Sequence, residues 1–184
     1  MTKLSTSAWV GHDLGLAAWF GGTLFGKFAL NPSVKVISSK EERGKVVNSA
    51  WNRYNAVNAA SLGTAAGTWV AGRAMLSGGE IGEDVRNLVL AKDILLGAGA
   101  VTGLASGVGG ILLSRQDPEG ATPTETGDEP APETPEPAST IQRWLDVLGN
   151  VKIMLAAAII AITTALAMKS GESQRWSVVS RLLP

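Results

Sequence analysis

Four asparagines recur at helical spacing and form the first candidate site. They are Asn48, Asn52, Asn55 and Asn58. Intervals of four, three and three residues place their side chains along one stripe of a helix. Such a stripe suits either a cavity for a polar ligand or hydrogen bonding between membrane helices, and we favour hydrogen bonding. Arg53 and Tyr54 flank the stripe and would suit an anionic headgroup.

The pair His12 and Asp13, near the start of the first long apolar stretch, is a second candidate site. Histidine titrates near neutral pH and aspartate accepts protons, so the pair suits a proton relay or a ligand site. Adjacent residues point about 100° apart on a helix, so the two side chains would not face one partner squarely. We favour the simpler interpretation, an interfacial pair at a membrane edge that the helix N-terminus stabilises.

Composition excludes several other chemistries. The chain has no cysteine, which rules out disulfides, thiol catalysis and thiolate metal sites. Its one histidine does not supply two haem ligands, and its methionines lack the paired spacing of a copper site. No phosphate-binding loop, serine-hydrolase motif or zinc-protease motif occurs. Basic residues do not form a stripe, so we expect no nucleic-acid partner. Because these motifs are missing, we predict a non-enzymatic protein with no metal and no cofactor.

Four apolar stretches are available to position these groups in a membrane. About 20 apolar residues cross the hydrocarbon core of a bilayer. The expected spans are residues 9–30, 55–76, 94–113 and 153–168. We expect Lys92 and Asp93 to mark the boundary of the third span, and Lys152 to extend from the fourth span toward the headgroups. Four tryptophans lie near expected span ends, where indole rings favour the interface: Trp9, Trp51, Trp144 and Trp176.

The predicted fold is all-α, an integral membrane four-helix bundle in three parts. Residues 1–113 hold three spans, with a charged helical connection at 39–54 that begins at a capping box, Ser39 to Glu42. Residues 114–138 are rich in proline and acid, so we predict a disordered linker between the third and fourth spans. Residues 139–184 supply an amphipathic lead-in, the fourth span and a C-terminal tail.

Glycine faces are expected to bring the helices together. In lipid little hydrophobic force acts between helices, and small residues four positions apart let backbones approach closely. Such residues occur in the first three spans: Gly11, Gly15, Gly22, Gly26, Gly63, Gly67, Gly99, Gly103, Gly107 and Gly110. Packing within one chain and dimerisation are both open, and we favour packing within the chain.

The sequence LGLAAWFGGTLF at residues 14–25 resembles the first span of small bacterial membrane proteins of unknown function, which are related to the transmembrane protein 205-like and CopD-like families. Asn31-Pro32 and the charged helix from Glu41 to Tyr54 follow in the same order, so the resemblance covers about the first 75 residues. It implies a four-span protein. The additional histidines and methionines of a copper site are missing here, and no family site residue is carried over.

We therefore expect a multi-pass protein of the cell membrane, which would be the plasma membrane of a bacterium. Its partners would be the lipid bilayer and other membrane proteins or a second copy of the chain. Basic residues concentrated between positions 27 and 53 favour a cytoplasmic first connection, with both termini outside. The leading hypothesis is an accessory or scaffold component that packs through its glycine faces. The alternative is a small carrier or ligand-binding protein that uses Asp13, His12 and the asparagine stripe.

Overall fold

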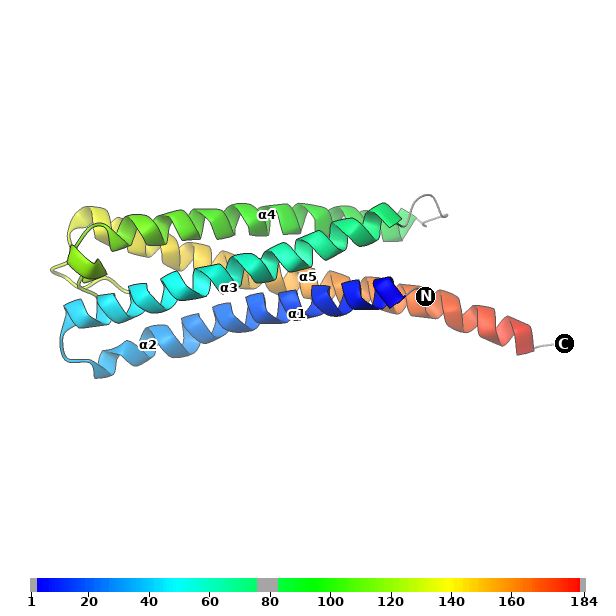
Figure 1. The fold of residues 1–184 in the computed structure, drawn as a ribbon, viewed down its shortest axis with the longest axis horizontal. Helices are drawn as coiled ribbons and strands as arrows, with labels where there is room; N and C mark the ends of the chain where they lie inside the picture. Colours follow the sequence, from blue (N-terminus) through cyan, green and yellow to red (C-terminus); the bar gives the residue numbers. More distant parts are fainter. Residues whose placement is uncertain (1–2, 76–82, 183–184) are drawn as a thin grey trace.

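Four long helices make up most of the chain and lie side by side (Figure 1). They are α1 (Lys3–Phe25), α3 (Lys40–Met75), α4 (Glu83–Ser114) and α5 (Glu136–Leu182). The computed structural model describes the backbone of residues 3–75 and 83–182, and the side chains of residues 6–72 and 85–169. Because these residues form helices and no strand, the all-α fold class is confirmed.

The first helix continues past residue 30, the expected end of the first span, and through Pro32. A π-helical turn, η1 (Gly26–Leu30), leads into α2 (Asn31–Ser33) and the short 3₁₀ helix η2 (Val34–Val36). Asn31 donates its backbone N–H to the carbonyl of Gly26, five residues back. This wider turn changes the hydrogen-bond register just before Pro32, whose missing N–H would otherwise interrupt an α-helix.

Helix α3 begins at the predicted cap and runs for 36 residues. Ser39 Oγ accepts the backbone N–H of Glu42 at 3.2 Å, as a capping box requires. In a full capping box, the carboxylate of Glu42 would in return accept the backbone N–H of Ser39. Here the Ser39 hydroxyl instead donates to the carboxylate of Glu41. One continuous helix runs from the charged connection to Met75, as expected, while the expected end of the second span at residue 76 lies outside the described residues.

Helix α5 starts at Glu136, three residues before its expected start, and runs for 47 residues. The amphipathic lead-in is part of this continuous helix, as expected, and its residues pack against α4 instead of lying on a membrane surface. Leu145 shows the consequence, because its side chain packs onto Gly109 of α4. Toward its C-terminal end α5 extends past the other helices (Figure 1).

The four helices pack as two close pairs, α1 with α3 and α4 with α5. Gly15 and Gly22 of α1 and Gly26 of η1 lie directly against α3 and leave no space there for a larger side chain. Gly99 is covered by Trp19, and Gly11 and Gly103 have looser neighbours. Packing within the chain is thus confirmed for these glycines.

Gly110 faces Asn52 and Asn55 of α3, but three other glycines of the predicted faces do not pack against any part of the chain that the structure describes. A Cβ atom added at Gly63, Gly67 or Gly107 would meet no other atom within 4 Å. The prediction that the second span packs through its glycines is wrong for the described chain, because helix α3 turns Ser61, Leu62 and Ala65 toward its neighbours instead.

An apolar core joins the two pairs around Trp19, which is fully buried. Its members come from all four long helices: Leu16, Trp19, Leu62, Ala65, Leu96, Ala156 and Ile159. Wherever water is excluded from the helix contacts, burying such side chains makes the main favourable contribution to the free energy of folding.

The segment expected to be a disordered linker is folded. Residues 115–135, called the acidic cap below, cover one end of the bundle between α4 and α5 (Figure 1). Thr124 donates its backbone N–H to the carbonyl of Lys40 at 3.2 Å, and Gly127 donates to that of Asn31 at 3.0 Å. The prediction of a disordered linker is therefore wrong. It considered only the composition of the segment, whereas the segment folds because basic side chains and backbone carbonyls at this end of the bundle bind it.

Two helical stretches in the described chain are long and apolar enough to cross a membrane, Val85–Ser114 in α4 and Glu136–Lys169 in α5. Less than a quarter of the most apolar window in each is buried inside the protein, at 22%. By length and composition these two stretches coincide with the expected third and fourth spans, whereas α1 and α3 do not meet the same criteria over their described residues.

Candidate functional site

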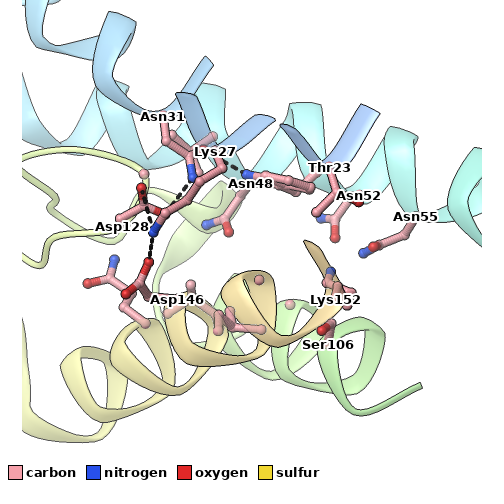
Figure 2. Close-up of a pocket in the computed structure, with 18 residues that line it drawn as sticks. Thr23, Lys27, Asn31, Asn48, Asn52, Asn55, Ser106, Asp128, Asp146 and Lys152 are labelled. Atoms are coloured by element: carbon pink, nitrogen blue, oxygen red, sulfur yellow. Dashed lines mark hydrogen bonds and ion pairs between the residues drawn. The ribbon is translucent and has the colours of Figure 1, made fainter. Parts of the chain in front are cut away.

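A polar cavity lies between the two helix pairs, at the end that the acidic cap covers (Figure 2). Its volume is about 70 Å³, which is room for roughly five water molecules. The polar side chains that line it come from every long helix and the cap: Thr23, Lys27, Asn31, Asn48, Asn52, Asn55, Ser106, Asp128, Gln142, Asp146 and Lys152. Polar groups gathered in a bundle interior are typical of a binding site for a polar ligand.

The asparagine stripe supplies one wall of this cavity. Asn48 is buried and donates its side-chain amide to the carbonyl of Gly120 in the cap, at 2.7 Å. Asn52 and Asn55 line the cavity without a hydrogen bond to any described residue. Asn58 lies one turn further along, buried, with its Oδ1 unpaired. Hydrogen bonding between helices, the interpretation we favoured, is therefore wrong for Asn52 and Asn55.

Lys152 provides an unpaired charge inside the bundle. Its side chain is only 5% exposed and lines the cavity, and its amine lies 5.7 Å from the ring centre of Trp51. No described carboxylate forms an ion pair with it, and Figure 2 shows it beside Ser106, facing Asn52 and Asn55. The expectation that Lys152 extends to the headgroups is wrong, because the face of α5 that carries it turns inward.

Lys27 lies at the opposite end of the cavity and is held by two carboxylates. It forms an ion pair with Asp146 and another with Asp128, the latter at 3.3 Å. Asn31 donates a further hydrogen bond to Asp128 at 2.6 Å. Burial raises the pKa of Asp128, although the nearby ammonium of Lys27 acts to lower it. One cation shared by two carboxylates leaves this end of the cavity with an excess of negative charge.

Exposed and partly buried ion pairs fasten the acidic cap to the start of α3. Lys40 lies 2.6 Å from a carboxylate oxygen of Glu125, and Arg43 lies 3.2 Å from the other. The hydrogen bond from Lys40 lowers the pKa of Glu125 and raises that of Lys40 itself. Glu119 pairs with Lys45, which lowers the pKa of Glu119. Exposed pairs contribute little individually, so the cap depends on all of them together with its backbone hydrogen bonds.

The second candidate site occupies a different part of the bundle. His12 is 2% exposed, and its Nδ1 donates to the carbonyl of Ala65 at 2.7 Å. Lys92, with 0% exposed, donates to His12 Nε2 at 2.8 Å, and its amine lies 3.9 Å from the ring centre of Trp69. A neutral imidazole thus accepts from a buried ammonium, which also interacts with the face of an aromatic ring.

This arrangement corrects two expectations. Lys92 does not extend outward from its helix but lies inside the bundle, against His12. His12 and Asp13 are not an interfacial pair, since His12 is buried and Asp13 is exposed. Nor do they join the asparagine stripe, because the core around Trp19 lies between them and the cavity.

Sequence analysis missed most of the charged groups of the cavity. Lys27, Asp146 and Gln142 were not identified, and Asp128 was assigned to the linker. One signal was available on α5, where Asp146, Gly149 and Lys152 recur at intervals of three and so lie along one side of the helix. Nothing in the sequence indicated that Asp128 would fold back onto Lys27.

No known protein family, no curated protein and no solved structure matches this chain.

Proposed function

We propose that the chain is an integral membrane protein with four spans, formed by α1, α3, α4 and α5. The support comes from the outer surface, where large apolar side chains are exposed on every long helix. Examples are Leu14 and Phe25 of α1, Val57 and Val70 of α3, Val101 and Leu104 of α4, and Val151 and Met154 of α5. Soluble proteins rarely expose apolar surface on this scale, whereas a bilayer covers it without cost.

The interior has the opposite character. Buried polar side chains include Thr23, Asn48, Ser106, Gln142 and Lys152, and they surround the cavity at one end of the bundle. Polar and ionisable groups are costly inside a membrane, and there they usually face a bundle interior and mark a substrate site. Apolar side chains outward and polar ones inward are therefore the distribution of a membrane bundle that holds something polar.

The function that the geometry supports best is that of a small membrane carrier or ligand-binding protein. The observation that carries this proposal is the group of unpaired side chains in the cavity, Lys152, Asn52 and Asn55. A buried ammonium without a partner is energetically unfavourable, and a bound ligand that supplies a partner removes that penalty. Asn52 is exposed and marks the side from which the cavity opens.

Filling the cavity tests this function directly. Gly110 of α4 faces it, with room for a Cβ atom 3.7 Å from the Asn55 side chain. In the Gly110→Leu variant the added side chain extends into the cavity, so we expect loss of a small polar molecule that co-purifies with the wild-type protein in mild detergent. The measurement is mass spectrometry of small molecules released from equal amounts of each protein.

Gly107→Leu is the matched control, because Gly107 is on the same helix and has open space around it. It should retain the molecule at the wild-type level. Identical small-molecule content in wild type, Gly110→Leu and Gly107→Leu would contradict the ligand-binding function.

Single cysteines test the four spans, since the natural chain has none. Ser38 and Glu129 lie at the end of the bundle that carries the cap, and Thr6 lies near the other end. We expect Ser38→Cys and Glu129→Cys to react with a membrane-impermeant maleimide from one side of the membrane, and Thr6→Cys from the other. The charge distribution favours the cytoplasm for Ser38. Labelling of all three positions from one side would contradict a spanning α1.

A second candidate function, the accessory or scaffold component, is favoured by one observation. Gly63 and Gly67 form an outward face of α3 that nothing in the described chain covers. Small residues at this spacing allow a further helix to approach closely. The same purification in mild detergent tests the scaffold function. A stoichiometric protein partner or a second copy of the chain would support it, and a monomer without partners in several detergents would contradict it.

A further inference from the structure

The two ends of the cavity carry opposite charge. At one end Lys152 has no described counter-ion. At the other end Lys27 is shared between Asp128 and Asp146, so two carboxylates face a single cation. One positive charge against two negative charges leaves that end with a net charge of minus one. The cavity as a whole is neutral and strongly dipolar.

The uncharged polar side chains divide between the two ends of the cavity in the same way. Asn52 and Asn55 lie beside Lys152 and offer amide N–H groups to an acceptor. Near Asp146, Gln142 is one helical turn away on the same face of α5 and only 6% exposed. The Oε1 atom of Gln142 is buried without any donor in the described part of the chain. One end of the cavity therefore lacks an acceptor, and the other lacks a donor.

The spacing between these ends limits the size of a ligand that reaches both. Asp146 and Lys152 are six residues apart on α5, which is about 9 Å along the helix axis. Both residues line the same small cavity, so their charged groups reach into it from positions less than two helical turns apart. Only a short ligand, with its opposite charges separated by a few bonds as in an α-amino acid, suits that spacing. Room for roughly five waters also corresponds to a molecule of about five non-hydrogen atoms.

We propose that the cavity binds a small zwitterionic α-amino acid, of the size of glycine or alanine. Its carboxylate accepts from Lys152 and the amides of Asn52 and Asn55, and its ammonium group donates to Asp146 and Gln142. This assignment rests on the ligand-binding function proposed above and names the ligand class for the same cavity.

Other charge types fit less well. A simple anion would pair with Lys152 but leave the excess negative charge near Asp146 and the Gln142 acceptor unmatched. A simple cation would leave the buried Lys152 ammonium alone. Only a ligand with both charges pairs every group, and unpaired buried groups are what make such sites selective.

The experiment measures binding to the full-length protein in lipid nanodiscs by equilibrium dialysis. The probes are glycine, L-alanine, and the two halves of glycine, acetate and methylammonium. We expect glycine and alanine to bind, and each half to bind at least about tenfold more weakly, which corresponds to about 1.4 kcal/mol. Lys152→Met and Asp146→Asn should each weaken glycine binding by at least about tenfold.

Controls separate binding from folding. Lys45→Met removes an ion pair with Glu119 on the outside of the cap and should leave glycine binding unchanged. Asn55→Asp keeps the shape of the side chain but places a carboxylate beside that of the ligand, so it should weaken binding without lowering the thermal midpoint of the protein. This variant keeps the test valid if Asp146→Asn fails to fold.

Three outcomes would overturn the assignment. Acetate binding as tightly as glycine would identify an anion site, and methylammonium binding as tightly would identify a cation site. A different small molecule that co-purifies and is lost in Gly110→Leu, with no binding of glycine or alanine, would reject the amino acid while preserving the ligand-binding function. Absence of any ligand in both experiments would reject the two proposals together.

Discussion

Replacing His12 with leucine is expected to lower the free energy of unfolding by about 3 kcal/mol. His12 provides the acceptor for the Lys92 ammonium, which is fully buried. In His12→Leu the ammonium stays in the bundle with its hydrogen-bond acceptor removed, and the Ala65 carbonyl loses one donor while keeping that from the Thr68 hydroxyl. The remaining contact with the Trp69 ring offsets only part of this penalty. Unfolding of the purified protein in mixed micelles with increasing SDS measures the change.

A double-mutant cycle makes the prediction specific. Lys92→Met removes the buried charge and keeps most of the volume, so we expect it to cost only about 1 kcal/mol. The double variant should be markedly more stable than His12→Leu alone, because the uncompensated charge is gone. If the two single effects simply added, the His12–Lys92 contact would not be energetically coupled and the interpretation would fail.

Replacing Gly15 with alanine is expected to separate α1 from α3 and to cost about 2 kcal/mol. The new Cβ would lie 2.5 Å from the carbonyl oxygen of Ser61 and 3.0 Å from the backbone nitrogen of Ala65. Neither backbone atom can rotate away as a side chain can, so the helices must move apart. The same SDS titration reports the loss of stability.

Gly67→Ala is the matched control on the partner helix. Its Cβ meets nothing within 4 Å, so the better helix propensity of alanine should raise stability by about 0.5–1 kcal/mol. Opposite signs for the two substitutions are the expected result. Equal effects would show that α1 and α3 are not in close contact at Gly15, and a loss of stability in Gly67→Ala would point to a second chain packed on that face.

Local signals in the sequence predicted parts of this fold well. The capping box at Ser39 and the unbroken helix after it depend on residues a few positions apart, and both are present. The asparagine spacing correctly placed Asn48, Asn52 and Asn55 on one side of α3, because helical periodicity fixes which residues share a face. The use of that face as a cavity wall was the interpretation we did not favour.

Contacts between distant segments explain what the sequence did not predict. The cap is rich in proline and acid, which is typical of disorder, but Glu125 and Asp128 find cationic partners more than 80 positions away in the chain. Lys92 and Lys152 were placed at membrane boundaries on the general rule that lysine reaches water. Their true positions depend on His12 and on the cavity, and neither partner is visible from local composition.

The ion pairs of the acidic cap join segments that are synthesised at different times. Lys40, Arg43 and Lys45 are synthesised well before Glu119 and Glu125, with which they pair in the folded protein. During insertion of the first two proposed spans these basic side chains are still without partners, so they act at full strength on the orientation of the nascent chain. Their charge is neutralised only when the later segment emerges, after the orientation signal has been read.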